Sequence, residues 1–382
     1  MKQQPVSGLN LSLRFLDSCV SRYLDGVFPP VEPPGTPGEW QKIAILARQN
    51  GLTPLIGYMI NQGVPELDGL PERIIETFLR DYKESTIRNV TIMDQAERTL
   101  SLFRLQGIKA FLVKGGAILE TIYRDTPGIR PVTDIDIVVA ADDFERAASV
   151  LSETGASARG FRPPNHQLMV WSNSRNVPVD LHGCFFQTRL PLGRAGFRLP
   201  EKLFSRHSEG FTGRLGQPQH LFYLVYHALQ HSLSRLIWWM DIISVIRQCS
   251  KKDMAVFEDI LTESAVNKVF SSLLWVMKRR LRVSIPENIS CLSPDIGISG
   301  RLALARTLQG RYPSQLNLLL YLACLPSSFD KIQFLKASLF PAAATLAGTY
   351  PESNRRAKQL HHLEHVFRFI KELLDMVFSM PT

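Results

Sequence analysis

Two aspartates separated by one residue, Asp134 and Asp136, interrupt an apolar run that ends at Val139. Successive side chains of a strand point to opposite faces, so the two carboxylates should share one face while Ile135 and Ile137 enter the core. Adjacent carboxylates repel each other, and Mg²⁺, which binds carboxylates, substrate phosphates and water, can offset this repulsion. The pair is therefore a candidate metal site, although two acids of this kind can also simply end a sheet edge.

A third carboxylate, Asp180, lies in the short apolar run PVDLH. The turn-forming residues 172–176 precede it, so residues 166–171 and 177–182 are typical of a β-hairpin. A neighbouring strand can bring Asp180 beside Asp134 and Asp136, which would complete a ligand set for two metal ions about 3.5–4 Å apart. The alternative is that Asp180 is an ordinary loop acid.

A lysine and two glycines, Lys114, Gly115 and Gly116, directly follow an apolar run at residues 110–113. We expect that run to be a strand and the glycines to open a short helix over residues 117–123. Glycines allow close approach of the backbone to a ligand, and helix N-terminal amides favour an anion, so the turn is a candidate phosphate site. Lys114 would add a positive charge, but glycine turns are common and most of them bind nothing.

This order of elements resembles the nucleotidyltransferase superfamily of DNA polymerase beta. Four motifs, LVKGGAILETIY, R-x₃-DIDIVV, VDLH and H-x₃-H-x₃-RLIWWMD, look more closely like a bacterial family known as nucleotidyltransferase family 5. The similarity extends from about residue 40 to about residue 350. It implies that Asp134 and Asp136 bind Mg²⁺ or Mn²⁺ and nucleotide phosphates, and that Asp180 assists the attacking hydroxyl.

The resemblance also implies an activity, the metal-dependent transfer of a nucleoside monophosphate from a nucleoside triphosphate such as ATP to a hydroxyl, with release of pyrophosphate. The acceptor stays open among a small molecule, a protein side chain and an RNA end. Lys114, Gly115, Gly116 and Arg130 are expected to bind the triphosphate, and His182 of the VDLH motif the substrate. The superfamily has Gly-Ser where this chain has Gly-Gly. The alternative is therefore a catalytically weak or inactive member that binds nucleotide or RNA as a regulatory module.

Composition limits the classes of partner and compartment. The net charge of +9 and the pI near 9.4 favour an anionic ligand, either nucleotide or nucleic acid. The five cysteines are scattered and lack C-x-x-C spacing, which favours a reducing cytoplasm over a disulfide framework or a zinc module. No run of apolar residues is long enough for a membrane span. The sequence does not indicate the oligomeric state.

We expect an α+β fold in which a small mixed sheet is embedded between two helical regions, with the protein mostly helical overall. The expected divisions are residues 1–107 (N-terminal helical region), 108–215 (catalytic core) and 216–382 (C-terminal helical region). The most strongly patterned helix begins at Pro71 and extends toward Gln106. Shorter helices are expected at residues 11–27, 144–153, 256–261, 266–281, 301–308, 316–325 and 356–380.

Residues 219–248 are expected to form one helix with a polar stripe. At about 100° per residue, six of its side chains fall within a sector of roughly 120°: His220, His227, His231, Arg235, Trp238 and Asp241. One interpretation is that His227, Arg235 and Asp241 line the nucleotide or acceptor cleft. A second is that they tie the helical region to the sheet, and a third is a zinc site from H-x₃-H, which lacks an obvious third ligand.

Overall fold

The computed structural model describes residues 11–31, 36–159, 166–172, 176–184, 213–231, 233–264, 266–286 and 327–339, with a few isolated positions. The helices in these ranges are α1 (Leu11–Asp25), α2 (Pro37–Gln49), α3 (Thr53–Asn61), α4 (Glu72–Leu105), α5 (Lys114–Thr121), α6 (Phe144–Glu153), α8 (Gln217–Gln230), α9 (Leu236–Gln248), α10 (Lys251–Glu263), α11 (Asn267–Leu281) and α14 (Ser328–Leu339), and two short 3₁₀ helices cover Pro65–Leu67 and Ala141–Asp143. The strands are β1 (Ala110–Leu112), β2 (Ile135–Val139), β3 (Ala156–Arg159), β4 (His166–Trp171) and β5 (Val179–His182). The α+β fold is confirmed.

The sheet is mixed and five-stranded, in the order β1-β2-β5-β4-β3. β2 and β5 run parallel to each other, and the remaining neighbours are antiparallel. β4 and β5 form the expected hairpin, whereas β3 was not expected from the sequence. Ile135 and Ile137 of β2 are fully buried, as the alternation of side chains requires.

The long helix α4 supports the sheet. Two buried side-chain amides on it hold the chain at the entries to β5 and β2. Gln95 pairs with the backbone of Val177 in both directions, at 2.7 Å each, and so fixes the entry to β5. Asn89 donates a hydrogen bond of 2.7 Å to the carbonyl oxygen of Arg130 and thereby fixes the segment that leads to β2.

Capping residues and glycines set the ends of the N-terminal helices. Thr36 and Glu39 make a capping box at the start of α2, with Pro37 in its first turn. Gly51 has a φ of +72° and separates α2 from α3. Gly57 of α3 has no room for a side chain, because a Cβ there would lie 2.1 Å from the carbonyl oxygen of Phe78 in α4. The close crossing of α3 and α4 therefore depends on this glycine.

The prediction of one helix over residues 219–248 is wrong. The chain breaks between α8 and α9, and Leu233 adopts a left-handed φ of +57°. Asn50 stabilises the break, since its side-chain oxygen accepts from the amide of Leu236 at 3.1 Å and its carbonyl oxygen accepts from the amide of Ile237 at 3.2 Å. The first amides of α9 are thus capped by a residue that lies far away in the sequence.

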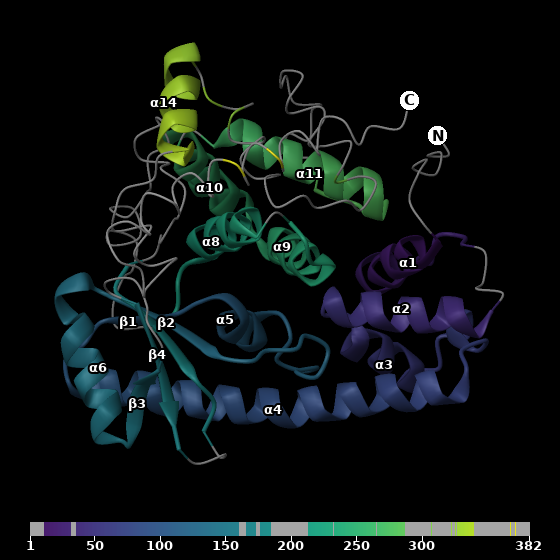
Figure 1. Ribbon diagram of the computed structural model, residues 1–382, viewed down its shortest axis with the longest axis horizontal. Helices are drawn as coiled ribbons and strands as arrows, with labels where there is room; N and C mark the ends of the chain where they lie inside the picture. Colours follow the sequence, from purple (N-terminus) through teal and green to yellow (C-terminus); the bar gives the residue numbers. More distant parts are fainter. Residues whose placement is uncertain are drawn as a thin grey trace.

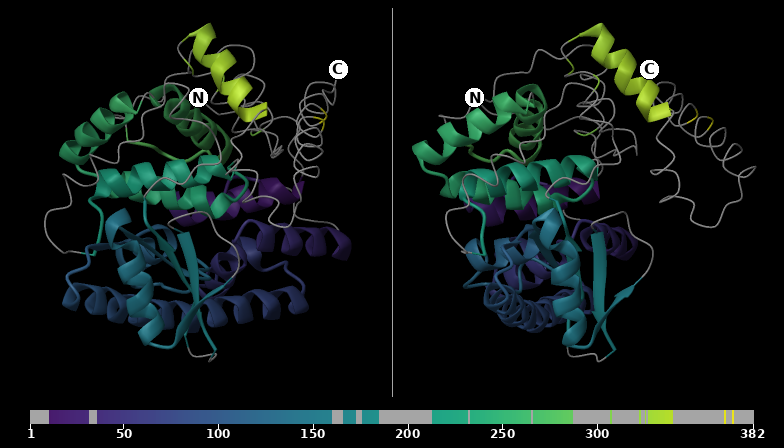
Figure 2. Two further views of the ribbon diagram at one scale, coloured as in Figure 1. Left: turned by 60° about the vertical axis from the view of Figure 1, so that its left-hand side comes forward. Right: turned by 90° about the vertical axis from the view of Figure 1, so that its left-hand side faces the viewer.

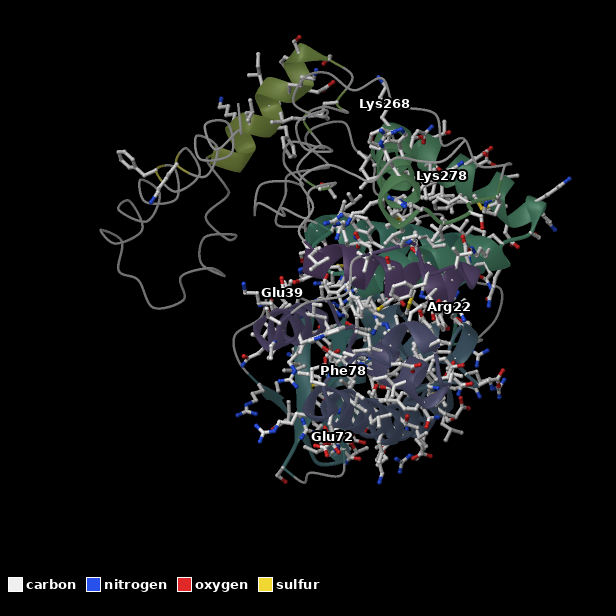
Figure 3. The ribbon with its side chains drawn as sticks, turned by 90° about the vertical axis from the view of Figure 1, so that its right-hand side faces the viewer. Arg22, Glu39, Glu72, Phe78, Lys268 and Lys278 are labelled. Atoms are coloured by element: carbon white, nitrogen blue, oxygen red, sulfur yellow. The ribbon has the colours of Figure 1, made fainter. Side chains whose placement is uncertain are left out.

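The helices surround the sheet in layers. In Figure 1 the sheet and α5 lie between α4 at the bottom and the α8–α9 pair above them. Both views in Figure 2 show the green helices α8 to α11 as a layer above the teal strands and the blue α4. Figure 3 looks onto the side formed by α1, α2, α4 and α11, with Lys268 and Lys278 of α11 near the top and Glu72 of α4 near the bottom. No helix in the described part of the chain is long and apolar enough to cross a membrane.

Other expectations have mixed outcomes. The helices expected at residues 11–27, 256–261 and 266–281 are confirmed as α1, α10 and α11, and that at 144–153 as α6. At the N-cap position of α6, the side chain of Asp143 pairs with Arg146 at 2.9 Å and caps no amide. The helices expected at residues 301–308, 316–325 and 356–380 fall largely or wholly outside the described residues. The three-part division of the chain stays a prediction.

Candidate active site

The three predicted carboxylates come together at one place on the sheet. Asp136 of β2 and Asp180 of β5 are directly paired in the parallel register, so their side chains lie side by side on one face. Asp134 lies one residue before β2. Oxygens of Asp134, Asp136 and Asp180 lie within 4.8 Å of one another. The three acids therefore form a cluster built from two adjacent strands.

The pKa of Asp134 reflects the repulsion within this cluster. Burial raises the pKa of Asp134 above its ordinary value, and the carboxylates of Asp136 and Asp180 raise it further. Asp134 is also the least buried of the three acids, so it is the one most open to an incoming ligand. Oxygen donors at this spacing suit a hard divalent cation. The residues present thus fit the metal that the cluster implies.

Lys114 supplies a positive charge directly at the cluster. Its Nζ lies 2.6 Å from Oδ1 of Asp136. Burial lowers the pKa of Lys114, but the carboxylate of Asp136 more than compensates, and the pKa lies well above its ordinary value. Burial likewise raises the pKa of Asp136, while Lys114 and His182 outweigh it and hold that pKa at about 2. Both groups of the pair are therefore charged at neutral pH.

The glycines after Lys114 lie inside the first turn of α5, so the helix begins at Lys114, three residues earlier than expected. The strained residue is Lys114 itself, with a left-handed φ of +49°. The glycines are needed for close packing. A Cβ on Gly115 would lie 2.6 Å from Nη1 of Arg130, and one on Gly116 would lie 2.8 Å from a methyl group of Leu112.

Two histidines complete the polar face. His182 lies two residues after Asp180 and on the same face, with Nε2 3.2 Å from Oδ1 of Asp136 and 3.3 Å from Oδ2 of Asp180. His166 is the register partner of His182 on β4, and its Nε2 lies 2.8 Å from Oδ1 of Asp180. Burial raises the pKa of Asp180, but hydrogen bonds from the two histidines outweigh it and hold the pKa far below its ordinary value. The sequence indicated His182 but not His166.

Arg130 and Asp241 bind each other. Nε and Nη2 of Arg130 each lie 3.1 Å from Oδ2 of Asp241, and the hydroxyl of Tyr123 donates to Oδ1 of Asp241 at 3.1 Å. Asp241 is fully buried. The carboxylate of Asp241 outweighs the effect of burial and raises the pKa of Arg130. This pair ties α9 to the segment before β2, which favours the interpretation that Asp241 connects the helical region to the sheet.

One side of α8 faces the carboxylates. His220 is buried, and burial lowers its pKa to about 4. Tyr223 is buried, which raises its pKa, and it lies within electrostatic range of Lys114 and Asp136. His227 follows on the same stripe, and burial and Lys114 hold its pKa far below the ordinary value. The same helical arithmetic places Tyr223 about 40° from His227, so the periodicity that indicated the stripe could also have found Tyr223.

The rest of the expected stripe forms a separate cluster at the helix break. His227, His231 and Trp238 are in ring contact, with centroids 4.7 to 5.3 Å apart. Arg235 is exposed and lies over the Trp238 ring at 5.5 Å. Among the described residues, no third ligand accompanies the His227–His231 pair. The structure therefore gives the zinc interpretation of H-x₃-H no support in the described part of the chain.

Comparison with known proteins places this site in a family. The model of one protein family, described as an uncharacterised nucleotidyltransferase, matches residues 36–282. That range includes Lys114, the three carboxylates and the α8–α9 pair. Searches among curated proteins and among solved structures gave no match. Because the family model matches well over half of the sequence, the chain belongs to this nucleotidyltransferase family.

Proposed function

We propose that this protein transfers a nucleoside monophosphate from a nucleoside triphosphate to a hydroxyl group, with a divalent cation held by Asp134, Asp136 and Asp180. The observation that carries the proposal is the convergence of these three carboxylates beside Lys114. Family membership supports nucleotidyl transfer in general. A bound Mg²⁺ or Mn²⁺ would neutralise charge on the triphosphate and orient it.

Each residue of the cluster has a role that follows from its position. Asp134 and Asp136 would hold the ion, together with Asp180 from the neighbouring strand. Asp180 would also receive the proton of the acceptor hydroxyl; the hydrogen bonds that it accepts from His166 and His182 would fix the position of its carboxylate, although they also make it a weaker base. Lys114 would turn from Asp136 to the triphosphate when the ion takes its place as the counter-charge.

The second part of the phosphate site would be the start of α5. The backbone amides of its first turn form a helix N-terminus, which attracts an anion. Gly116 occupies the place at which the superfamily has a serine. Lys114 would therefore make the phosphate contact that a serine hydroxyl makes in the superfamily. Tyr223 and His227 of α8 would form the opposite wall and contact the nucleotide or the acceptor.

One observation favours the non-catalytic alternative. Lys114 already balances the charge of Asp136, so the cluster is partly compensated without any ion. A protein that keeps this pair intact would bind nucleotide without transferring it.

One experiment distinguishes the transferase from the non-catalytic binding protein. The purified chain is incubated with each nucleoside triphosphate labelled at the α-phosphate, in the presence of Mg²⁺ or Mn²⁺ and a cell lysate as the source of acceptor. Transfer predicts label in a small-molecule, protein or RNA product together with pyrophosphate, and loss of both with Asp136→Asn. Binding of triphosphate with no labelled product from any acceptor fraction would favour the regulatory alternative.

A further inference from the structure

A second group of possible metal ligands lies beside the three carboxylates and differs from them in chemistry. His166, Asp180 and His182 each present one ligand atom, and these atoms lie within 4.8 Å of one another. The group shares Asp180 with the carboxylate cluster but replaces the two other acids by imidazoles. All three side chains are largely buried, with exposures of 13%, 12% and 8%.

The geometry of this group matches that of ligands around one small ion. Nε2 of His166 lies 2.8 Å from one oxygen of Asp180, and Nε2 of His182 lies 3.3 Å from the other. When two ligand atoms each lie about 2.1 Å from a zinc ion, their separation depends on the ligand–zinc–ligand angle. It is about 3.0 Å for a right angle and about 3.4 Å for the tetrahedral angle. The 3.3 Å distance falls within that range, whereas the 2.8 Å distance is that of a hydrogen bond, so His166 and Asp180 would have to separate by a few tenths of an ångström to share an ion.

The backbone fixes the two imidazoles in this arrangement. His166 and His182 are register partners on β4 and β5, and their rings stack with centroids 4.4 Å apart and an interplanar angle of 21°. Both rings direct Nε2 toward Asp180. A pair of imidazoles and a carboxylate provide three protein ligands and leave a position for a further ligand, which is the pattern of catalytic zinc sites.

We infer that His166, His182 and Asp180 form a nitrogen-containing site for a divalent transition ion of the zinc or cobalt type, beside the oxygen-only site for Mg²⁺ or Mn²⁺. Imidazole ligands favour zinc and similar ions, whereas carboxylate ligands suit magnesium and manganese. The inference rests on the proposed function for the place of this ion next to the acceptor, because Asp180 belongs to both groups. The binding of the ion itself can be tested without any activity.

The test is a titration of the purified full chain with Co²⁺, followed by visible absorption, and competition of the bound Co²⁺ by Zn²⁺ and by Mg²⁺. The wild-type chain should give the intense absorption of a low-coordinate, nitrogen-ligated site, and Zn²⁺ but not Mg²⁺ should displace the ion. His166→Gln, which keeps a hydrogen-bond donor but is a poor ligand, should lower Co²⁺ affinity at least tenfold. Equal affinity and equal spectra in the two proteins would overturn the inference.

Two matched variants and one measurement on the unaltered protein complete the design. Asp134→Asn changes only the oxygen site and His231→Gln removes an exposed histidine elsewhere, so both should retain the Co²⁺ spectrum. If His166→Gln does not fold, wild-type protein labelled with ¹⁵N-histidine decides, because Zn²⁺ should shift two imidazole Nε2 resonances and the absence of any shift refutes the site.

Failure of this inference is distinguishable from failure of the proposed function. If His166→Gln binds Co²⁺ as the wild type does but triphosphate still binds only with Mg²⁺ or Mn²⁺, the nitrogen site is wrong and the carboxylate site stands. If Co²⁺ binds through the histidines while triphosphate binding ignores Mg²⁺ and Mn²⁺, the nitrogen site stands and the proposed function is wrong.

Discussion

Replacing Asp241 with asparagine tests the structural role of the buried pair with Arg130. The variant keeps the size of the side chain and an oxygen that can accept from Tyr123, but it removes the negative charge that faces Arg130. Asp241 is fully buried and Arg130 is 8% exposed, so water cannot replace the lost partner. Breaking a buried ion pair by removal of one partner costs about 3–5 kcal/mol. We expect Asp241→Asn to lower the free energy of unfolding by an amount in that range.

The assay is urea unfolding, with a surface pair of the same type as the control. Asp94 and Arg98 form an ion pair at 2.7 Å on α4, and both side chains are 64% exposed. Exposed pairs of this kind contribute about 0.2–1 kcal/mol, so Asp94→Asn should change stability little. The double variant Arg130→Met with Asp241→Asn should recover part of the loss, because it removes the unpaired guanidinium.

Triphosphate affinity of the same variant distinguishes a structural role from a role in substrate binding. Below its melting temperature, folded Asp241→Asn should bind triphosphate with nearly the affinity of the wild type. A loss of stability under about 1 kcal/mol combined with a large loss of triphosphate affinity would refute the structural role and restore Arg130 and Asp241 to the substrate site.

Three further predictions follow from single positions. The pKa of His220 is about 4 in the folded protein and near 6.5 when unfolded, so acid favours the unfolded state. The free energy of unfolding should therefore fall as the pH drops from 6.5 toward 4, by about 2 kcal/mol at pH 5. Unfolding curves of His220→Asn should lack most of this loss. Lys114→Met should weaken triphosphate binding by roughly tenfold or more in an equilibrium titration, and it should also lower the melting temperature, because it leaves the buried carboxylate of Asp136 without its counter-charge. A lower melting temperature with unchanged triphosphate affinity would make the residue structural. Gly57→Ala should lower the free energy of unfolding by about 1–3 kcal/mol, because its Cβ would meet the backbone of Phe78. The control Gly38→Ala should not lower it, because a Cβ at Gly38 meets nothing within 4 Å. Equal stability of the two variants would contradict the close crossing of α3 and α4.

Local periodicity explains which parts of the site were predictable. The two-residue repeat of a strand places Asp180 and His182 on one face, and the same rule relates Asp134 to Asp136. A glycine pair after a strand likewise indicates the start of α5. These features depend on neighbours in the sequence, so the sequence alone predicts them.

Features that depend on distant partners were missed. His166 joins the site only through its register with His182, which depends on the length of the turn between β4 and β5. The break between α8 and α9 is stabilised by Asn50, which lies 186 positions before Leu236. Arg130 and Asp241 are 111 positions apart, and a buried ion pair between them has no local signature. Each error therefore comes from tertiary contacts that override a local pattern.

The most direct test of the central claim measures triphosphate binding by wild type and Asp136→Asn, with and without Mn²⁺. If the three carboxylates hold the ion that receives the triphosphate, the wild type should bind tightly only with Mn²⁺, and Asp136→Asn should lose at least tenfold in affinity under that condition. In the presence of EDTA the variant should bind no more weakly than the wild type, because it has one fewer negative charge near the phosphates. Equal affinity of both proteins with Mn²⁺, or full binding by the wild type in EDTA, would contradict a metal site at Asp134, Asp136 and Asp180.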